Sequence, residues 1–167
     1  MDGGGLKSDG WRPSKGEGFA RALLDETHAL HKRGFNCAEA AVWALSRYWD
    51  MDMETSVATG LGGGIARSGG TCGAVTGAIL ALGRKVGRRE PGDEAGKSLA
   101  IRLGQEVIEG FVKETGAADC REIIGFVLKD PDGSSRYAAG GFKTGKCQDA
   151  VDRAVRLAIA AWENTGA

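Results

Sequence analysis

The chain contains four cysteines, and each one stands where a helix is predicted to begin. The residues in front of them are types that favour the N-cap position, because their side chains accept hydrogen bonds from the free backbone amides of the first turn. These residues are Asn36 before Cys37, Thr71 before Cys72, Asp119 before Cys120 and, three positions earlier, Thr144 before Cys147. All four cysteines are therefore predicted to lie in the first turn of a helix.

A cysteine in the first turn of a helix is expected to ionise more readily than a free one. Unpaired amides and the helix dipole favour the thiolate by about 0.3–1 kcal/mol at an exposed site and by up to about 2 kcal/mol in good geometry. A thiol pKa of about 8.5 would then fall to about 7.5. Four thiolates in one place would repel one another, and a disulfide or a bound metal would relieve that repulsion. The alternative is that the cysteines only fill space in the core, as unbonded cysteines commonly do.

The spacing of the cysteines excludes several familiar cofactor motifs. No two of them lie within four residues of each other, unlike the ligands of zinc ribbons and ferredoxins. The Cys-x-x-Cys-His motif for covalent haem attachment is absent. A helical chain of this length also does not depend on disulfides for its stability.

A glycine-rich stretch leads into Cys72. Residues 60–73, GLGGGIARSGGTCG, hold seven glycines in fourteen positions, which predicts a loop. A phosphate-binding loop would end in Gly-Lys-Ser/Thr or carry Gly-x-Gly-x-x-Gly after a strand, and neither occurs, so no nucleotide cofactor is expected. We expect instead that Gly73 and Gly77 let another helix approach closely. We also expect Gly70, Gly73 and Gly77 to leave room beside the Cys72 sulfur for a partner thiol or a cofactor.

Three further side chains allow a functional and a structural interpretation. His28 and His31 stand three residues apart on one predicted helix. This spacing can bind a metal, but histidines on an ordinary helix face, exposed or partly buried, are more common. Arg67 could lie near Cys72 and favour its thiolate, or it could be a solvated loop charge.

Apolar residues recur at helical spacing through most of the chain, and no segment shows the convincing alternation of a strand. The predicted fold is all-α, a single-domain bundle of about five main helices over residues 18–167, preceded by a disordered arm over residues 1–17. One long helix, residues 93–115, is expected to turn Ile108, Phe111 and Val112 inward. The other main helices are expected at about 18–33, 37–49, 74–86 and 145–163, with short helices near 54–60 and 120–125.

The charge balance restricts the classes of partner. The 167 residues carry 22 Lys and Arg and 22 Asp and Glu, so the formal net charge is zero. This argues against a nucleic-acid partner and against a polybasic membrane anchor. No apolar run reaches the roughly 20 residues that span a bilayer, and the N-terminus lacks the apolar region of a signal peptide. We therefore expect a cytoplasmic protein without membrane insertion, whose thiols stay reduced unless they are catalytic.

Several segments together resemble the C-GCAxxG-C-C family of putative redox-active proteins. They are FNCAEAA at 35–41, GGGI at 62–65, GTCGAVTGA at 70–78, CRE at 120–122 and the final Cys147. The resemblance runs from about residue 23 to residue 158, and its central motif is written here as Cys-Gly-Ala-x-x-Gly. It implies that Cys37, Cys72, Cys120 and Cys147 are the four cysteines of the family. It also implies an oxidoreductase or transporter component as partner, and a relation to a domain of split-Soret cytochrome c, whose haem motif this chain lacks.

Three hypotheses follow. In the first, the protein is a thiol oxidoreductase or electron-transfer protein in which Cys72 is the most reactive sulfur and Cys37, Cys120 or Cys147 closes a disulfide with it. In the second, all four cysteines ligate an iron–sulfur cluster or another metal for electron transfer. In the third, the chain is a helical interaction protein with incidental buried cysteines. Small-residue helix faces also make a homodimer a reasonable expectation.

Overall fold

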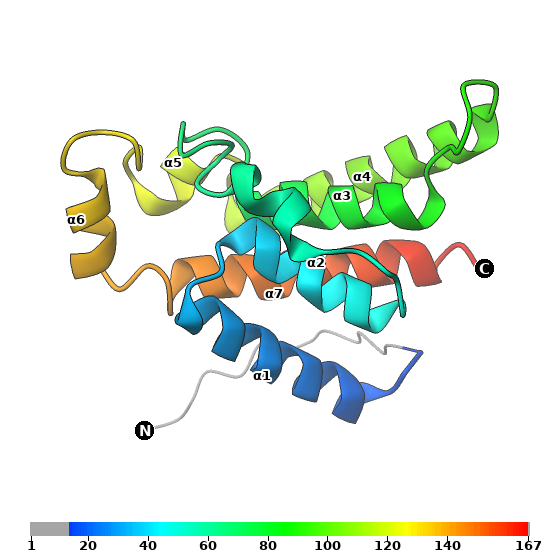
Figure 1. The fold of residues 1–167 in the computed structure, drawn as a ribbon, viewed down its shortest axis with the longest axis horizontal. Helices are drawn as coiled ribbons and strands as arrows, with labels where there is room; N and C mark the ends of the chain where they lie inside the picture. Colours follow the sequence, from blue (N-terminus) through cyan, green and yellow to red (C-terminus); the bar gives the residue numbers. More distant parts are fainter. Residues whose placement is uncertain (1–13, 167) are drawn as a thin grey trace.

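The computed structural model describes residues 14–166, which form an all-α bundle (Figure 1). Five helices are long, as predicted: α1 (Glu17–Arg33), α2 (Cys37–Tyr48), α3 (Gly73–Val86), α4 (Glu94–Thr115) and α7 (Lys146–Glu163). Three are short: η1 (Thr55–Leu61), α5 (Cys120–Ile124) and α6 (Gly133–Ala139). Within residues 14–166 there is no strand, only an isolated antiparallel bridge between Thr71 and Asp119. The predicted fold class is confirmed.

Helix α2 packs against α1, α3 and α7, while α4 packs against α3 and α7 (Figure 1). The facing sides of α2 and α3 are rich in alanine, which lets the two backbones approach each other. Larger side chains such as Leu45, Leu82 and Phe111 are fully buried between the helices. Each of these contributes roughly 1.5–3 kcal/mol by leaving water. The short helices α5 and α6 and the start of α7 lie together at one end of the bundle (Figure 1).

The start of α2 follows the sequence prediction closely. The Asn36 side chain accepts hydrogen bonds from the amides of Ala38 and Glu39, at 2.9 and 3.0 Å. The Glu39 carboxylate in turn accepts from the Asn36 amide at 2.8 Å. This reciprocal capping box fixes the first turn of α2, and therefore the position of Cys37, which is its first residue.

The other three predicted caps are wrong in detail. Cys72 is itself the N-cap of α3, so Thr71 is not. Asp119 is the N-cap residue of α5 as predicted, but its side chain makes no capping bond and instead pairs with Arg121 at 3.0 Å. Helix α7 begins at Lys146, after Gly145, so Thr144 is not its cap. All four cysteines still lie at the cap or in the first turn of a helix, but only Cys37 follows a capping side chain.

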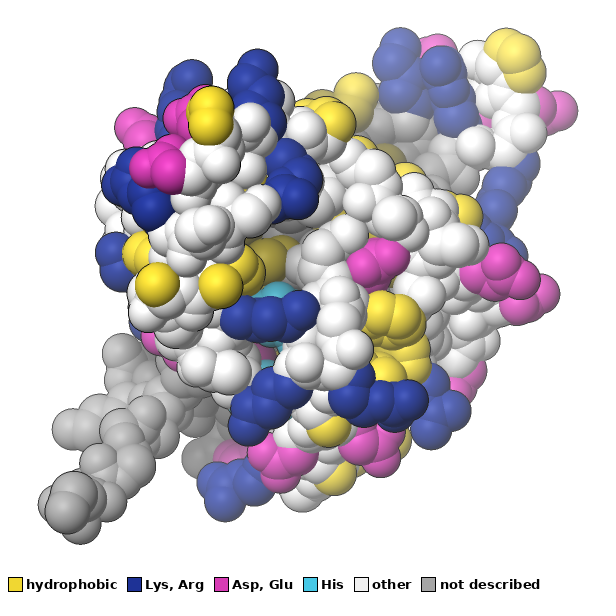
Figure 2. Space-filling model, turned by 60° about the vertical axis from the view of Figure 1, so that its left-hand side comes forward, with side chains coloured by type: hydrophobic (Ala, Val, Ile, Leu, Met, Phe, Trp, Pro, Cys, Tyr) yellow, Lys and Arg dark blue, Asp and Glu magenta, His cyan; other side chains and the backbone are white. Residues whose placement is uncertain are grey.

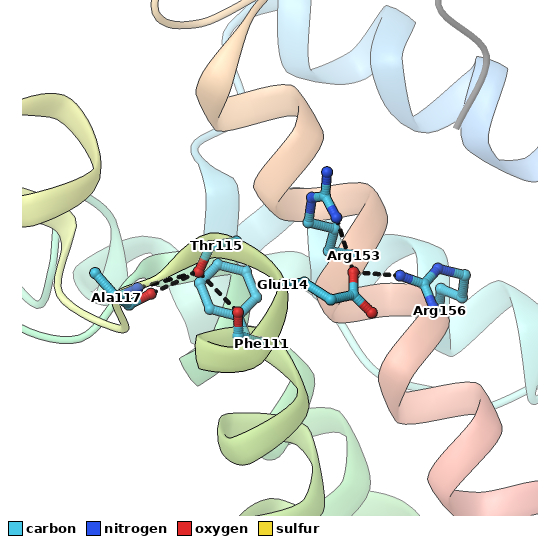
Figure 3. Close-up of polar contacts among 6 residues, drawn as sticks. All are labelled: Phe111, Glu114, Thr115, Ala117, Arg153 and Arg156. Carbon is cyan, nitrogen blue, oxygen red and sulfur yellow. Dashed lines mark hydrogen bonds and ion pairs between the residues drawn. The ribbon is translucent and has the colours of Figure 1, made fainter. Parts of the chain in front are cut away.

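The C-terminal end of α4 is fastened on two sides (Figure 3). Glu114 accepts hydrogen bonds from Arg153 and Arg156 on α7, the first of them at 2.8 Å. The Thr115 hydroxyl lies 2.7 Å from the carbonyl oxygens of both Phe111 and Ala117. Since Cys120 follows only a few residues later, these contacts hold the segment that leads into α5.

Two expectations about α4 and the N-terminal arm have to be qualified. Ile108 and Val112 are 37% and 38% exposed, so they do not face the core as predicted, whereas Phe111 does. Of the predicted arm, residues 1–13 lie outside the described residues. Ser14 donates from its amide to Glu163 at 3.0 Å, and Lys15 pairs with Asp50 at 2.7 Å.

Over residues 14–166, none of the helices combines the length and the apolar character that a bilayer crossing requires.

The glycine-rich loop contains an unusual left-handed turn. Five consecutive residues, 63–67, have positive φ, and three of them are not glycine: Ile65, Ala66 and Arg67. Left-handed backbone costs such residues roughly 1–2 kcal/mol each, so the surroundings must hold it in place. The Gly70 amide donates to the Gly64 carbonyl at 3.0 Å. A Cβ at Gly64 would lie only 2.3 Å from the Gly70 carbonyl oxygen, so this closure requires glycine. Cys72 follows this turn by five residues in the chain.

Candidate functional site

The isolated bridge holds the segments that carry Cys72 and Cys120 next to each other. Thr71 and Asp119 face each other, the Cys72 amide donates to the Ala118 carbonyl at 2.8 Å, and the Cys120 amide donates back across the bridge at 2.7 Å. Because side chains alternate along extended backbone, both cysteines point to the face opposite the bridged pair. That face is the interior: Cys72 is 4% exposed and Cys120 is 7% exposed.

Cys37 and Cys147 form the second pair, and a side-chain hydrogen bond between them is the largest influence on the pKa of each. Cys147 is the second residue of α7, and its amide donates to the Phe142 carbonyl at 2.9 Å. The Tyr137 hydroxyl, on α6, lies close enough to contribute to the lowering of the pKa of Cys147. Cys147 is 6% exposed, whereas Cys37 is half-buried.

The two pairs meet at Cys37. Cys37 packs against the main core, which contains Cys72, and also against the smaller apolar cluster that contains Cys120 and Cys147. All four sulfurs are close enough to influence one another electrostatically. The fold therefore brings together four cysteines that are separated by up to 110 positions in the chain, and all four are free thiols.

Three of the four thiols hold their protons more tightly than usual. Burial raises the pKa of Cys72 to about 11. Burial, followed by the neighbouring Cys72 and Cys147, raises the pKa of Cys120 to about 12. The pKa of Cys37 is raised because its thiol donates a hydrogen bond to Cys147 and because it is buried. The predicted lowering of the pKa at a helix start is therefore wrong for these three cysteines: desolvation outweighs the helix dipole.

Cys147 differs, since its pKa is lowered to about 7. The hydrogen bond from Cys37 is the largest cause, and burial works against it. The Tyr137 hydroxyl and the positive charges of Lys143 and Lys146 add to the lowering. Of the two thiols, Cys147 is therefore the one that loses its proton more readily.

His31 lies beside this pair, with its Nε2 atom 3.8 Å from the Cys37 sulfur. It is only 2% exposed, and its Nδ1 atom has no hydrogen-bond partner. Burial, together with the nearby charges of Lys143 and His28, lowers the pKa of His31 to about 4. A neutral imidazole adds no positive charge next to Cys37, so it does not stabilise a Cys37 thiolate by charge, and its tautomer decides whether Nε2 donates to or accepts from the Cys37 sulfur.

The two histidines of α1 make different contacts, which agrees with the structural interpretation of their spacing. His28 turns to α7, where its Nε2 atom lies 2.7 and 2.8 Å from the two carboxylate oxygens of Asp152. Asp152 is 4% exposed, and burial raises its pKa despite this contact. His28 thus fastens α1 to α7, while His31 faces the cysteines.

Arg67 donates to the Ser134 hydroxyl at 2.7 Å, which ties the glycine-rich loop to α6.

The three glycines predicted to line the sulfur have identifiable neighbours. A Cβ at Gly77 would lie 2.5 Å from the Ala38 carbonyl oxygen, so α2 and α3 touch here, backbone to backbone. A Cβ at Gly73 would lie 3.2 Å from the Ala38 amide and 3.4 Å from the Cys37 Cβ. The carbonyl of Gly70 accepts from the Cys120 amide. The close approach predicted for Gly73 and Gly77 is present, and a cofactor role for the three glycines stays a prediction.

The four sulfurs do not form a metal-binding arrangement. Within residues 14–166, no three side chains of His, Cys, Asp or Glu are placed so that they could hold one ion. As arranged here, the cysteines do not fit an iron–sulfur cluster.

Two side chains of the site were missed from the sequence, Tyr137 and Lys143. Both fall in residues 129–143, whose composition predicts only a surface loop. The segment instead contains α6, and it folds over Cys147 through the stacked rings of Tyr137 and Phe142, whose centroids are 6.0 Å apart. No periodic pattern marks these positions, because they become neighbours of Cys147 only through this fold.

The fold and the site together define a class of protein: a helical bundle in which four free cysteines cluster at the starts of helices. Residues 35–160 match the family model described as "Putative redox-active protein (C_GCAxxG_C_C)", and the chain belongs to this family. No curated protein and no solved structure gives a significant match. The family match confirms the resemblance based on the cysteines and the central glycine motif.

Proposed function

We propose that the protein is a dithiol redox protein that exchanges electrons with organic disulfides through Cys147 and Cys37. The observation that supports this most directly is the meeting of the two cysteines at the starts of α2 and α7, where each shifts the pKa of the other and the pKa of Cys147 is lowered to about 7. The thiolate is the attacking form in disulfide exchange, and an attacking thiol works best when its pKa is near the ambient pH. The proposed nucleophile is therefore Cys147 rather than Cys72.

The reaction takes two steps. The Cys147 thiolate attacks one sulfur of a disulfide RSSR, which forms a mixed disulfide and releases RS⁻. The Cys37 thiol then attacks the Cys147 sulfur, forms the Cys37–Cys147 disulfide, and gives its proton to the second departing thiolate as RSH. Two electrons pass from the protein dithiol to the substrate disulfide. A dithiol such as dithiothreitol reverses the process.

Cys72 and Cys120 have no direct part in this exchange. Both are buried thiols with raised pKa values, so they attack slowly at neutral pH. Their closeness to Cys37 and Cys147 makes them a second dithiol that could accept the disulfide by a later internal exchange. Disulfide mapping after long oxidation would detect this transfer.

The test is disulfide mapping after oxidation with excess 2-hydroxyethyl disulfide. The folded protein is quenched with iodoacetamide, and its disulfides are located by peptide mass spectrometry. We expect a Cys37–Cys147 disulfide and two alkylated cysteines, 72 and 120. In Cys37→Ser, the mixed disulfide should accumulate on Cys147. Four alkylated cysteines after oxidation would refute the proposal.

The same material tests the cluster hypothesis. Protein purified without oxygen is assayed for iron, acid-labile sulfide and visible absorption. We expect less than one iron per ten chains, since the sulfurs do not fit a cluster here. Stoichiometric iron and sulfide that disappear in all four single Cys→Ser variants would replace the dithiol proposal with a cluster-binding one.

A further inference from the structure

We propose that Lys143 makes this site selective for small disulfides that carry negative charge, such as those bearing carboxylates. The inference rests on the proposed dithiol function and names its substrate class. A small molecule is favoured over a protein disulfide because Cys147 is recessed: it is 6% exposed and is packed among Tyr137, Phe142 and their neighbours.

Lys143 is placed at the site by the turn that precedes α7. It follows Phe142, whose carbonyl accepts from the Cys147 amide and whose ring packs against the Cys147 cluster. From this position its ammonium group acts electrostatically on both Cys147 and His31. Lys143 therefore lies close to the attacking sulfur, within the turn that the Cys147 amide closes on the Phe142 carbonyl.

The neighbouring cations are already engaged, and Lys143 is not. Lys146 donates to the Ile123 carbonyl at 3.0 Å. Arg136 lies over the Phe126 ring at 4.3 Å and 3.7 Å from Asp132. Among residues 14–166, no carboxylate forms an ion pair with Lys143. Its charge is thus available to a substrate.

The space-filling view shows the face around this end of the bundle (Figure 2). Histidine side chains are visible within a hollow, and dark blue Lys and Arg side chains stand at its edge. Both histidines of the chain are on α1, so the hollow lies beside this helix. Substrate charge should matter at the site, because a thiolate repels an anionic disulfide and a nearby lysine offsets that repulsion.

The experiment compares three aliphatic disulfides of similar size: 3,3′-dithiodipropionate (anionic), 2-hydroxyethyl disulfide (neutral) and cystamine (cationic). Rates of oxidation of the full chain are measured by stopped flow at low salt. Each rate is divided by the rate of dithiothreitol with the same disulfide, which removes intrinsic differences in reactivity. We expect a normalised preference of about tenfold for the anionic over the cationic probe, falling toward one in 1 M salt.

Lys143→Glu should lower this normalised preference by about tenfold or invert it, and Lys143→Gln should have an intermediate effect. Lys97→Glu is the matched control, since it makes the same charge change on the exposed N-terminal part of α4. It should leave the preference unchanged. The ratio is independent of any general change in Cys147 reactivity.

The outcomes separate the two proposals. Equal normalised rates for all three probes, or a preference that Lys143→Glu leaves intact, would overturn the selectivity and leave the dithiol function standing. No reaction of Cys147 with any of the three disulfides would overturn the dithiol function itself.

Discussion

Both cysteine pairs lie at helix starts, but the pKa values of Cys72 and Cys120 are raised whereas the pKa of Cys147 is lowered. Cys72 and Cys120 lie at helix starts beneath the bridge, with no cation or hydroxyl donor among the main influences on their sulfurs. Cys147 also lies at a helix start, but its sulfur accepts hydrogen bonds from Cys37 and Tyr137 and is close to two lysines. A helix start therefore does not by itself activate a cysteine: burial cancels its field unless specific donors replace the lost water.

The largest expected effect is the difference in reaction rate between two single variants, each lacking one cysteine of a different pair. Cys147→Ser removes the proposed nucleophile and should lower the rate of reaction with 2-hydroxyethyl disulfide by at least about 100-fold. Cys72→Ser should change this rate less than about threefold, because that thiol is protonated at neutral pH. Stopped-flow kinetics at pH 7 measures both, and circular dichroism checks that each variant is folded. Equal losses in the two variants would show that the pairs do not act separately.

The pH dependence of alkylation should separate the two pairs without any substitution. Iodoacetamide modification of Cys147 should rise with pH to a plateau, with its midpoint near the pKa of about 7. Modification of Cys72 should keep rising toward the pKa of about 11. At pH 7 the rates should differ by roughly 100-fold, since the larger thiolate fraction outweighs the weaker nucleophilicity of the low-pKa sulfur. Peptide mass spectrometry resolves the sites, and a common midpoint would contradict the assignment.

The distance between the pairs depends on the contact of α2 with α3, and Gly77→Ala should disturb it. The new Cβ would lie 2.5 Å from the Ala38 carbonyl oxygen, next to Cys37, so the helices must separate. We expect a loss of about 1–3 kcal/mol in the free energy of unfolding, measured in urea. Gly83→Ala, on the same helix with no atom within 4 Å of the new Cβ, is the control. It should be neutral or stabilising by about 0.5–1 kcal/mol, and a similar loss there would refute the packing argument.

The sequence was sufficient to predict the main helices. It was not sufficient to predict which cysteines pair or which of them is activated. Helical spacing predicts the five main helices, and the Asn36–Glu39 capping box is local enough to be recognised directly. The exposure of Ile108 could not be predicted, because periodicity indicates an apolar stripe without showing how wide the covering helices are. Whether a thiol is activated depends on contacts between distant segments, such as Tyr137 with Cys147. These contacts have no periodic signature.

Tyr137→Phe should give the smallest effect and test the comparison most selectively. Removal of the hydroxyl takes one hydrogen bond from the Cys147 thiolate and keeps the ring that stacks on Phe142. The pKa of Cys147 should rise by about one unit, since a hydrogen bond to a charged group contributes roughly 1.5–3 kcal/mol, part of which water restores. The rate at pH 7 should fall only about two- to threefold, because the more basic sulfur is a better nucleophile. Tyr48→Phe removes a hydroxyl that donates to Glu163 at 2.7 Å and should leave the Cys147 profile unchanged. If Tyr137→Phe also leaves the profile unchanged, the lysines and Cys37 alone hold the thiolate, and the Tyr137 hydroxyl has no part in the difference between the pairs.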